Sequence, residues 1–273
     1  MQTPTAENVF GRSWTLLTQN WVIIVPGLIV AIITGILTGL LAPSTTYVSG
    51  GDYTTIRSVG VVSSMIIAVI GVIGAIIAIT YTTGMAGAAW QRGTATLADG
   101  GAAFREDAGH VLSAMVFLFL VGIVASVLAP FTLGLSILVL FFLFPYTMAA
   151  AVLGNFGGID ALRESYRIAT QHVATTAIII VVAAVIAIIG GILAGILHFI
   201  FLIGPLVSAI LNEAVLAYLT LVIVGVYLGY RNTVAVAAAP AAAAASAAAP
   251  PMPDVAPPPP PPTDDTPGAN PAT

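Results

Sequence analysis

The sequence predicts an all-α integral membrane protein with six transmembrane helices, and two observations indicate this. Of the 273 residues, 59% are hydrophobic and only 7% are charged, whereas a soluble globular domain has roughly 25% charged residues. Six stretches also have the length that a helix needs to cross a bilayer core, which is about 20 residues for a thickness of about 30 Å. A water-soluble fold is therefore excluded.

The predicted membrane domain covers residues 1–231. Many residues in these stretches are β-branched, but the length of the runs favours helices over strands, and the alternation expected of a membrane barrel is missing. The first run is too long for the apolar core of a signal peptide, so we expect an anchor. Pro145 should kink the fourth span near Phe141 and Phe142. The spans are expected at residues 21–41, 61–81, 111–130, 131–153, 177–199 and 206–230.

The arginines predict the orientation, since cytoplasmic loops are enriched in basic residues. With six spans, all arginines except Arg57 lie on the side of the N-terminus. Both termini are therefore expected in the cytoplasm. The chain has no lysine and is rich in Ala and Pro, which is typical of a GC-rich bacterial genome and points to a bacterial inner membrane. The outer link at residues 42–60 is polar, and we expect a solvated loop there.

Each pair of spans follows a moderately polar segment, which suggests three units of an amphipathic elbow helix plus a helical hairpin. Residues 13–21 align without gaps to residues 165–173, with Ser, Thr and Gln repeated in register. The middle copy is weaker and is marked mainly by Phe104 and His110. Aromatic and arginine side chains on opposite faces of such a helix predict a position in the cytoplasmic headgroup layer.

The elbow residues have two interpretations. They contact anionic lipid headgroups, or they only position the next span, and the second is favoured because so few arginines attract lipid weakly. The headgroup-contact candidates are Trp14, Arg12, Arg105, Arg163, Tyr166 and Arg167.

Polar residues inside the predicted spans are rare, and the candidates are His198, Glu213 and Asn212. Counted from the link between the last two spans, His198 and Glu213 lie at depths of roughly 10 and 13 Å, which puts the two side chains within reach of each other. A later start of the last span would instead leave Glu213 at the interface. A proton or substrate site is one interpretation. An interhelical hydrogen bond that fixes the hairpin register is the other, and it is favoured.

Chemical motifs are scarce in this chain. It has no cysteine and a net charge of −4, which excludes thiolate chemistry and disfavours nucleic-acid binding. We found no metal-binding or catalytic motif, so we expect no enzyme activity, no metal and no cofactor. Gly191 and Gly195 form a GxxxG pattern, which favours helix packing within the chain over a dimer.

The segment from Pro145 to Val173, with Ala161-Leu162-Arg163-x-Ser165-Tyr166, resembles the glycerophosphoryl diester phosphodiesterase membrane domain family. The closing residues 225–232 are similar to the end of that family's membrane domain. An acid usual before the central elbow is replaced here by Asn155. The resemblance implies a membrane domain only, because the hydrolase of that family is a separate barrel domain for which this chain has no room.

The segment 232–273 is rich in Ala and Pro and is expected to be a disordered tail, either a spacer or a ligand for a Pro-recognising partner. The sequence thus predicts a non-enzymatic multi-pass scaffold or accessory subunit in the lipid bilayer, with a membrane-protein partner or a second copy of itself. The alternative is a transporter or lipid-handling protein with an intramembrane cavity.

Overall fold

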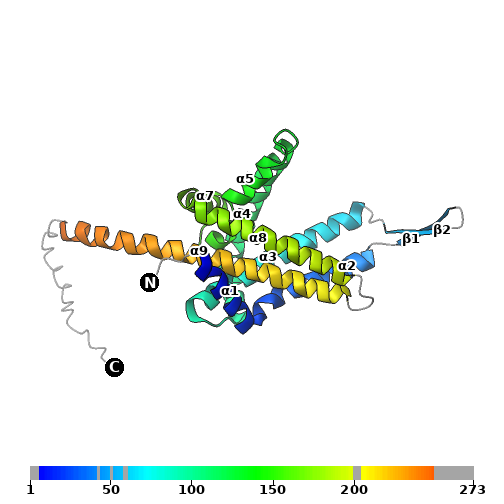
Figure 1. Ribbon diagram of the computed structural model, residues 1–273, viewed down its shortest axis with the longest axis horizontal. Helices are drawn as coiled ribbons and strands as arrows, with labels where there is room; N and C mark the ends of the chain where they lie inside the picture. Colours follow the sequence, from blue (N-terminus) through cyan, green and yellow to red (C-terminus); the bar gives the residue numbers. More distant parts are fainter. Residues whose placement is uncertain (1–5, 42–43, 50–51, 58–60, 199–203, 249–273) are drawn as a thin grey trace, which may run out of the picture. The chain divides into compact units, whose positions relative to one another are not determined.

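The computed structural model describes residues 6–41, 44–49, 52–57, 61–198 and 204–248 (Figure 1). The chain divides into the units Met1–Thr233 and Val234–Thr273, and the description that follows concerns the first. In chain order the elements are α1 (Ala6–Gln19), the 3₁₀ helix η1 (Trp21–Ile24), α2 (Val25–Leu41), β1 (Ser44–Ser49), β2 (Asp52–Arg57), α3 (Val61–Arg92), α4 (Leu97–Leu128), α5 (Leu135–Leu143), α6 (Thr147–Leu153), α7 (Gly158–Gln171), α8 (Val173–His198) and α9 (Gly204–Ala248).

Six helical segments among the described residues are long and apolar enough to cross a membrane, which confirms the predicted fold class. Two of them begin or end well beyond the predicted spans because the polar residues beside the apolar runs continue the helices, in α3 to Arg92 and in α4 from Leu97. The segments are Trp21–Leu41, Val62–Arg92, Leu97–Leu128, Leu135–Leu153, Val173–Leu197 and Gly204–Arg231.

The turn between α3 and α4 has clear local causes. Gly93 has φ of +82° after the last residue of α3, a conformation that glycine adopts without strain. Thr96 and Asp99 form a capping box that begins α4. Arg92 pairs with Asp99 at 2.7 Å across the turn. The boundary between the second and third spans is therefore fixed at both helix ends.

Two segments outside the predicted spans contain regular secondary structure. The link expected as a solvated loop contains an antiparallel hairpin of β1 and β2, with Ser49 opposite Asp52, because β-branched residues flank the Gly50-Gly51 pair, a strong hairpin signal. The predicted disordered tail begins within α9, which continues to Ala248, and alanine is the strongest helix former. The remainder of the tail, residues 249–273, lies outside the described residues.

The two aligned elbow segments have the same local geometry. Helices α1 and α7 both end at the aligned glutamines, and the next residues have nearly equal dihedrals, φ −126° and ψ 53° at Asn20 and φ −128° and ψ 49° at His172. Ser13 and Ser165 are both fully buried. The middle segment differs, since α4 passes through His110 without a break. A third separate elbow helix is therefore absent from α4, and the three-unit description is not confirmed.

Pro145 interrupts the fourth span more strongly than a kink would. Helix α5 ends at Leu143 and α6 begins at Thr147, a few residues after the predicted position. Ser165 on α7 compensates for the break, because its hydroxyl accepts a bond from the Tyr146 N–H at 3.1 Å and donates one to the Leu143 carbonyl at 3.0 Å. Hydroxyl side chains commonly satisfy backbone groups that a proline frees inside a membrane.

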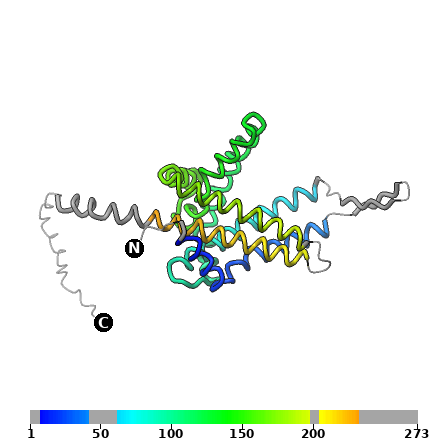
Figure 2. The backbone as a smooth tube through the Cα atoms, in the orientation of Figure 1, coloured from blue at the N-terminus to red at the C-terminus, as the bar shows by residue number. Residues whose placement is uncertain are grey.

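The buried core of the first unit lies at the end of the spans where α1 and α7 are found, which we name the elbow end. The largest fully buried side chains include Ile23, Met85, Tyr146, Ile179 and Tyr227, and each lies near the elbow end of its span. Helix α7 packs against α4 and α6, and neighbouring spans run side by side, as α8 and α9 do in Figure 2. The opposite ends present exposed apolar side chains, including Leu40, Val62, Phe131 and Ile196.

Candidate functional site

Glu213 is the acidic residue within the apolar part of the spans, and the structure places it against α2. The side chain is half-buried, and a Cβ added at Gly27 would overlap its carboxylate. Gly27 and its neighbour Pro26 are buried in the first turn of α2. Glu213 forms no hydrogen bond or ion pair with any residue that the structure describes. A carboxyl group inside a membrane is a functional-site candidate by default.

The other two intramembrane candidates do not join Glu213 in a described cluster. His198 is the last residue of α8, and its side chain lies outside the described residues, so its contact with Glu213 stays a prediction. Asn212 is exposed on α9. Sequence reasoning missed Gly27, because a glycine that faces an acid is visible only once the pairing of helices is known.

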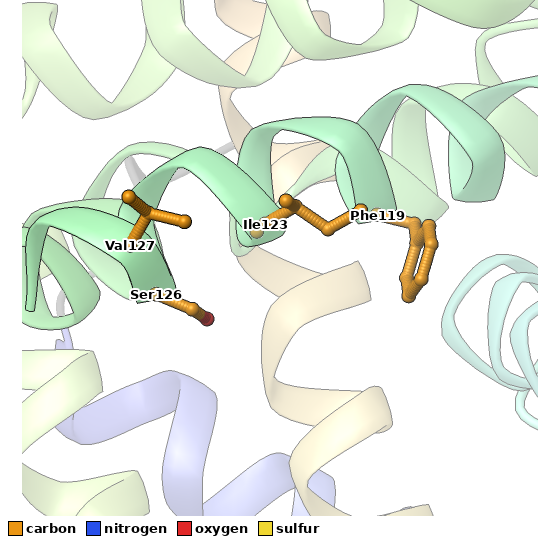
Figure 3. Close-up of a pocket in the computed structure, with 5 residues that line it drawn as sticks. Phe119, Ile123, Ser126 and Val127 are labelled. Carbon is orange, nitrogen blue, oxygen red and sulfur yellow. The ribbon is translucent and has the colours of Figure 1, made fainter.

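A second candidate surface is an open groove on α4. Its lining residues are Phe119, Gly122, Ile123, Ser126 and Val127, and its volume is about 500 Å³. Figure 3 shows that the labelled side chains all come from this one helix. A Cβ at Gly122 would meet nothing within 4 Å. Gly122 and Ser126 lie four residues apart, the spacing that lets a second membrane helix approach closely, and we name this pair with its three apolar neighbours the α4 notch.

The GxxxG pair on α8 also faces outward, contrary to the prediction that it packs within the chain. A Cβ at Gly191 or at Gly195 would meet nothing within 4 Å, whereas one at Gly190 would lie 2.9 Å from a Val215 methyl group on α9. The contact between α8 and α9 therefore uses the neighbouring glycine. The sequence pattern could not distinguish these faces, since all three glycines lie in the same apolar run.

The headgroup candidates on α1 are only partly free to meet lipid. Trp14 is 61% exposed, although one edge of its ring contacts Tyr218 with centroids 6.1 Å apart. Arg12 lies over the Trp90 ring at 4.6 Å and donates to the Trp90 carbonyl at 3.2 Å. Arg12 is thus engaged by α3, and Trp14 keeps an exposed face.

The headgroup candidates on α7 and α4 differ in exposure and in ion pairing. Tyr166 is 50% exposed. Arg163 pairs with Asp160 at 3.5 Å and Arg167 pairs with Glu164 at 2.6 Å, as expected for i, i+3 pairs on a helix surface. Arg105 is exposed on α4. The structure does not bring these residues together into one lipid-binding cluster.

Two polar anchors near the core were missed by sequence reasoning. The Asn20 amide donates to the Leu16 and Gly93 carbonyls at 3.0 and 3.1 Å and accepts from the Ala95 N–H at 2.8 Å, so it ties the break after α1 to the turn between α3 and α4. Trp90 donates its indole N–H to the Leu221 carbonyl on α9 at 2.7 Å. His172, which aligns with Asn20, makes a different contact: its ring stacks on the Tyr230 ring with the centroids 3.8 Å apart.

Within the part of the chain that the structure describes, no group of three or more His, Cys, Asp or Glu residues is placed to hold a metal ion. Comparison with known proteins finds no matching family model, no matching curated protein and no matching solved structure.

Proposed function

We propose that this multi-pass membrane protein is a non-enzymatic scaffold or accessory subunit, which holds another membrane protein through its exposed helix faces. The α4 notch is the observation that supports this function best. Its floor is made of Gly122 and Ser126, and the apolar side chains of Phe119, Ile123 and Val127 form a ridge along one side. A partner helix that lies in the notch gains van der Waals contacts along this ridge and a hydrogen-bonding hydroxyl at Ser126.

The anchors at the elbow end suit such a role. Hydrogen bonds from Asn20, Trp90 and Ser165 connect separate segments of the chain. These bonds hold the elbow ends of the spans in one arrangement. The apolar faces farther along the spans, the α4 notch and the Gly191–Gly195 face among them, are left open. A fixed base with open apolar faces is the arrangement that a scaffold requires.

Site-specific photo-crosslinking in native membranes tests this function. A photoreactive residue at Ile123 should crosslink to a partner protein, while one at Val124, which is also exposed but lies about 100° around the helix, should not. Gly122→Leu should fill the notch and abolish both the crosslink and co-purification of the partner. Gly35→Leu, at another glycine with nothing within 4 Å of its Cβ position, is the matched control. Lipid adducts alone at both positions would contradict the scaffold function.

A transporter or lipid-handling protein is the second candidate, and the half-buried carboxyl of Glu213 favours it. Purified protein in liposomes separates the two candidates, because clear and saturable flux of a lipid or solute would exclude a pure scaffold. The membership in the glycerophosphoryl diester phosphodiesterase membrane domain family stays a prediction, as does binding of a Pro-recognising partner to the tail.

We also propose a bacterial inner membrane as the location, with both termini in the cytoplasm. The support is the distribution of arginines in the sequence. Because the chain has no cysteine, single cysteines at Ser49 and Thr263 give a clean test. Labelling of intact cells by an impermeant maleimide should occur at Ser49 only.

A further inference from the structure

We infer that Glu213 and the notch at Gly27 form a proton-binding site inside the membrane. The site differs from the scaffold surface proposed above, since it is built from α2 and α9 and not from α4. Glu213 lies nine residues after Gly204, so its Cα is about 13 Å along the helix from that end. Gly27 is the third residue of α2, and its missing side chain leaves the space that the carboxyl group occupies.

The described surroundings offer Glu213 no positive charge. Helix α2 carries no titratable residue. Arg12 on α1 lies over Trp90, and the Tyr218 hydroxyl donates to the Phe10 carbonyl. Arg92 at the end of α3 pairs with Asp99. The remaining titratable groups on the helices that pack against this part of α9 are Glu7 and His198, whose side chains lie outside the described residues, and Tyr81 on α3.

A proton is therefore the ligand that suits this position. An ionised carboxylate among apolar side chains is costly unless it is paired, and binding one proton removes the charge without any partner. The site binds and releases one proton.

Carbodiimide labelling of the full-length protein in liposomes tests the site. A lipid-soluble carbodiimide reacts with protonated carboxyl groups in apolar surroundings, and the adduct is located by mass spectrometry of peptides. Glu213 should be labelled, and its labelling should decrease as the pH rises. Glu164, which forms a salt bridge on α7, is the internal control and should react only with a water-soluble carbodiimide. Glu213→Gln should eliminate the adduct.

Substitutions at Gly27 and Glu213 test whether the space at Gly27 is needed for proton binding. Gly27→Ala should expel the carboxyl group from the notch and shift the pH of half-maximal labelling downward by about one pH unit or more, whereas Gly35→Ala, at an open glycine on the same helix, should leave it unchanged. If Gly27→Ala does not fold, Glu213→Asp withdraws the carboxyl group from the notch and should give the same shift. Absence of Glu213 labelling at every pH, or labelling that does not depend on pH, would overturn the proton site. Equal midpoints in all variants would overturn the role of the notch.

Discussion

Replacing Ser165 by alanine should destabilise the protein, because this one hydroxyl bonds to two backbone groups at the helix break around Pro145. The Tyr146 N–H and the Leu143 carbonyl bond to it at 3.1 and 3.0 Å, and Ser165 is fully buried. In the alanine variant the buried Tyr146 N–H and the half-buried Leu143 carbonyl both lose the hydroxyl that bonds to them. The α5–α6 break would then lose the contact that holds it on α7.

The magnitude follows from counting these two groups. An unsatisfied buried backbone group costs about 1–3 kcal/mol in soluble proteins, but side-chain hydrogen bonds between membrane helices average only about 0.6 kcal/mol. We therefore expect Ser165→Ala to lower the free energy of unfolding by about 1–3 kcal/mol in total. Ser13 is the matched control, since it is aligned with Ser165 and equally buried, but its hydroxyl has no partner among the described residues. Ser13→Ala should change the free energy by less than about 0.5 kcal/mol or stabilise the protein.

Equilibrium unfolding in mixed micelles, with increasing dodecyl sulfate and detection by far-ultraviolet circular dichroism, measures both variants under the same conditions. The comparison uses the difference between the unfolding free energies of the two variants. Errors from extrapolating each value to zero dodecyl sulfate therefore largely cancel. Equal destabilisation by the two substitutions would show that burial of the serines, and not the repair of the proline break, decides their contribution.

Three further predictions use the same unfolding assay. Gly225→Ala places a Cβ into the Trp90 ring and should destabilise the fold by about 1–3 kcal/mol, while Gly191→Ala, at an open position, should have almost no effect. Asn20→Ala removes three hydrogen bonds and should cost about 2–3 kcal/mol at about 1 kcal/mol each; an unchanged midpoint would refute its anchoring role. Truncation after Asn232, one residue before the first unit ends at Thr233, should leave the midpoint unchanged, whereas a large fall would show that the second unit stabilises the first.

Length and hydropathy were sufficient to predict the class of fold, because the bilayer imposes both on any helix that crosses it. Internal similarity also carried real information, since the alignment of residues 13–21 with 165–173 places Asn20 and His172 at breaks of the same geometry. The alignment failed at His110, where the polar segment and the span continue as one helix. Segments of similar composition can form either a separate elbow helix or the first part of a continuous span. In α4 the capping box at Thr96 sets where the continuous helix begins.

The candidate sites were harder to predict because they depend on which faces of the helices meet. Glu213 stands out in the sequence as an acid within an apolar run, but nothing in the chain marks Gly27 as its neighbour. The α4 notch was missed, and the GxxxG pair was assigned to the wrong face. Periodicity shows which residues share a face of one helix, whereas packing decides which face stays open.

The concentration of the core at the elbow end has a consequence for how the protein fits membranes of different thickness. Spans whose buried side chains lie mainly at one end can tilt outward by different amounts while most of those side chains stay packed. A bilayer accommodates helices of unequal length through tilt at modest cost. The helical segments that cross the membrane range from 19 to 32 residues with their polar ends included, and individual tilt allows their apolar parts to match one bilayer thickness.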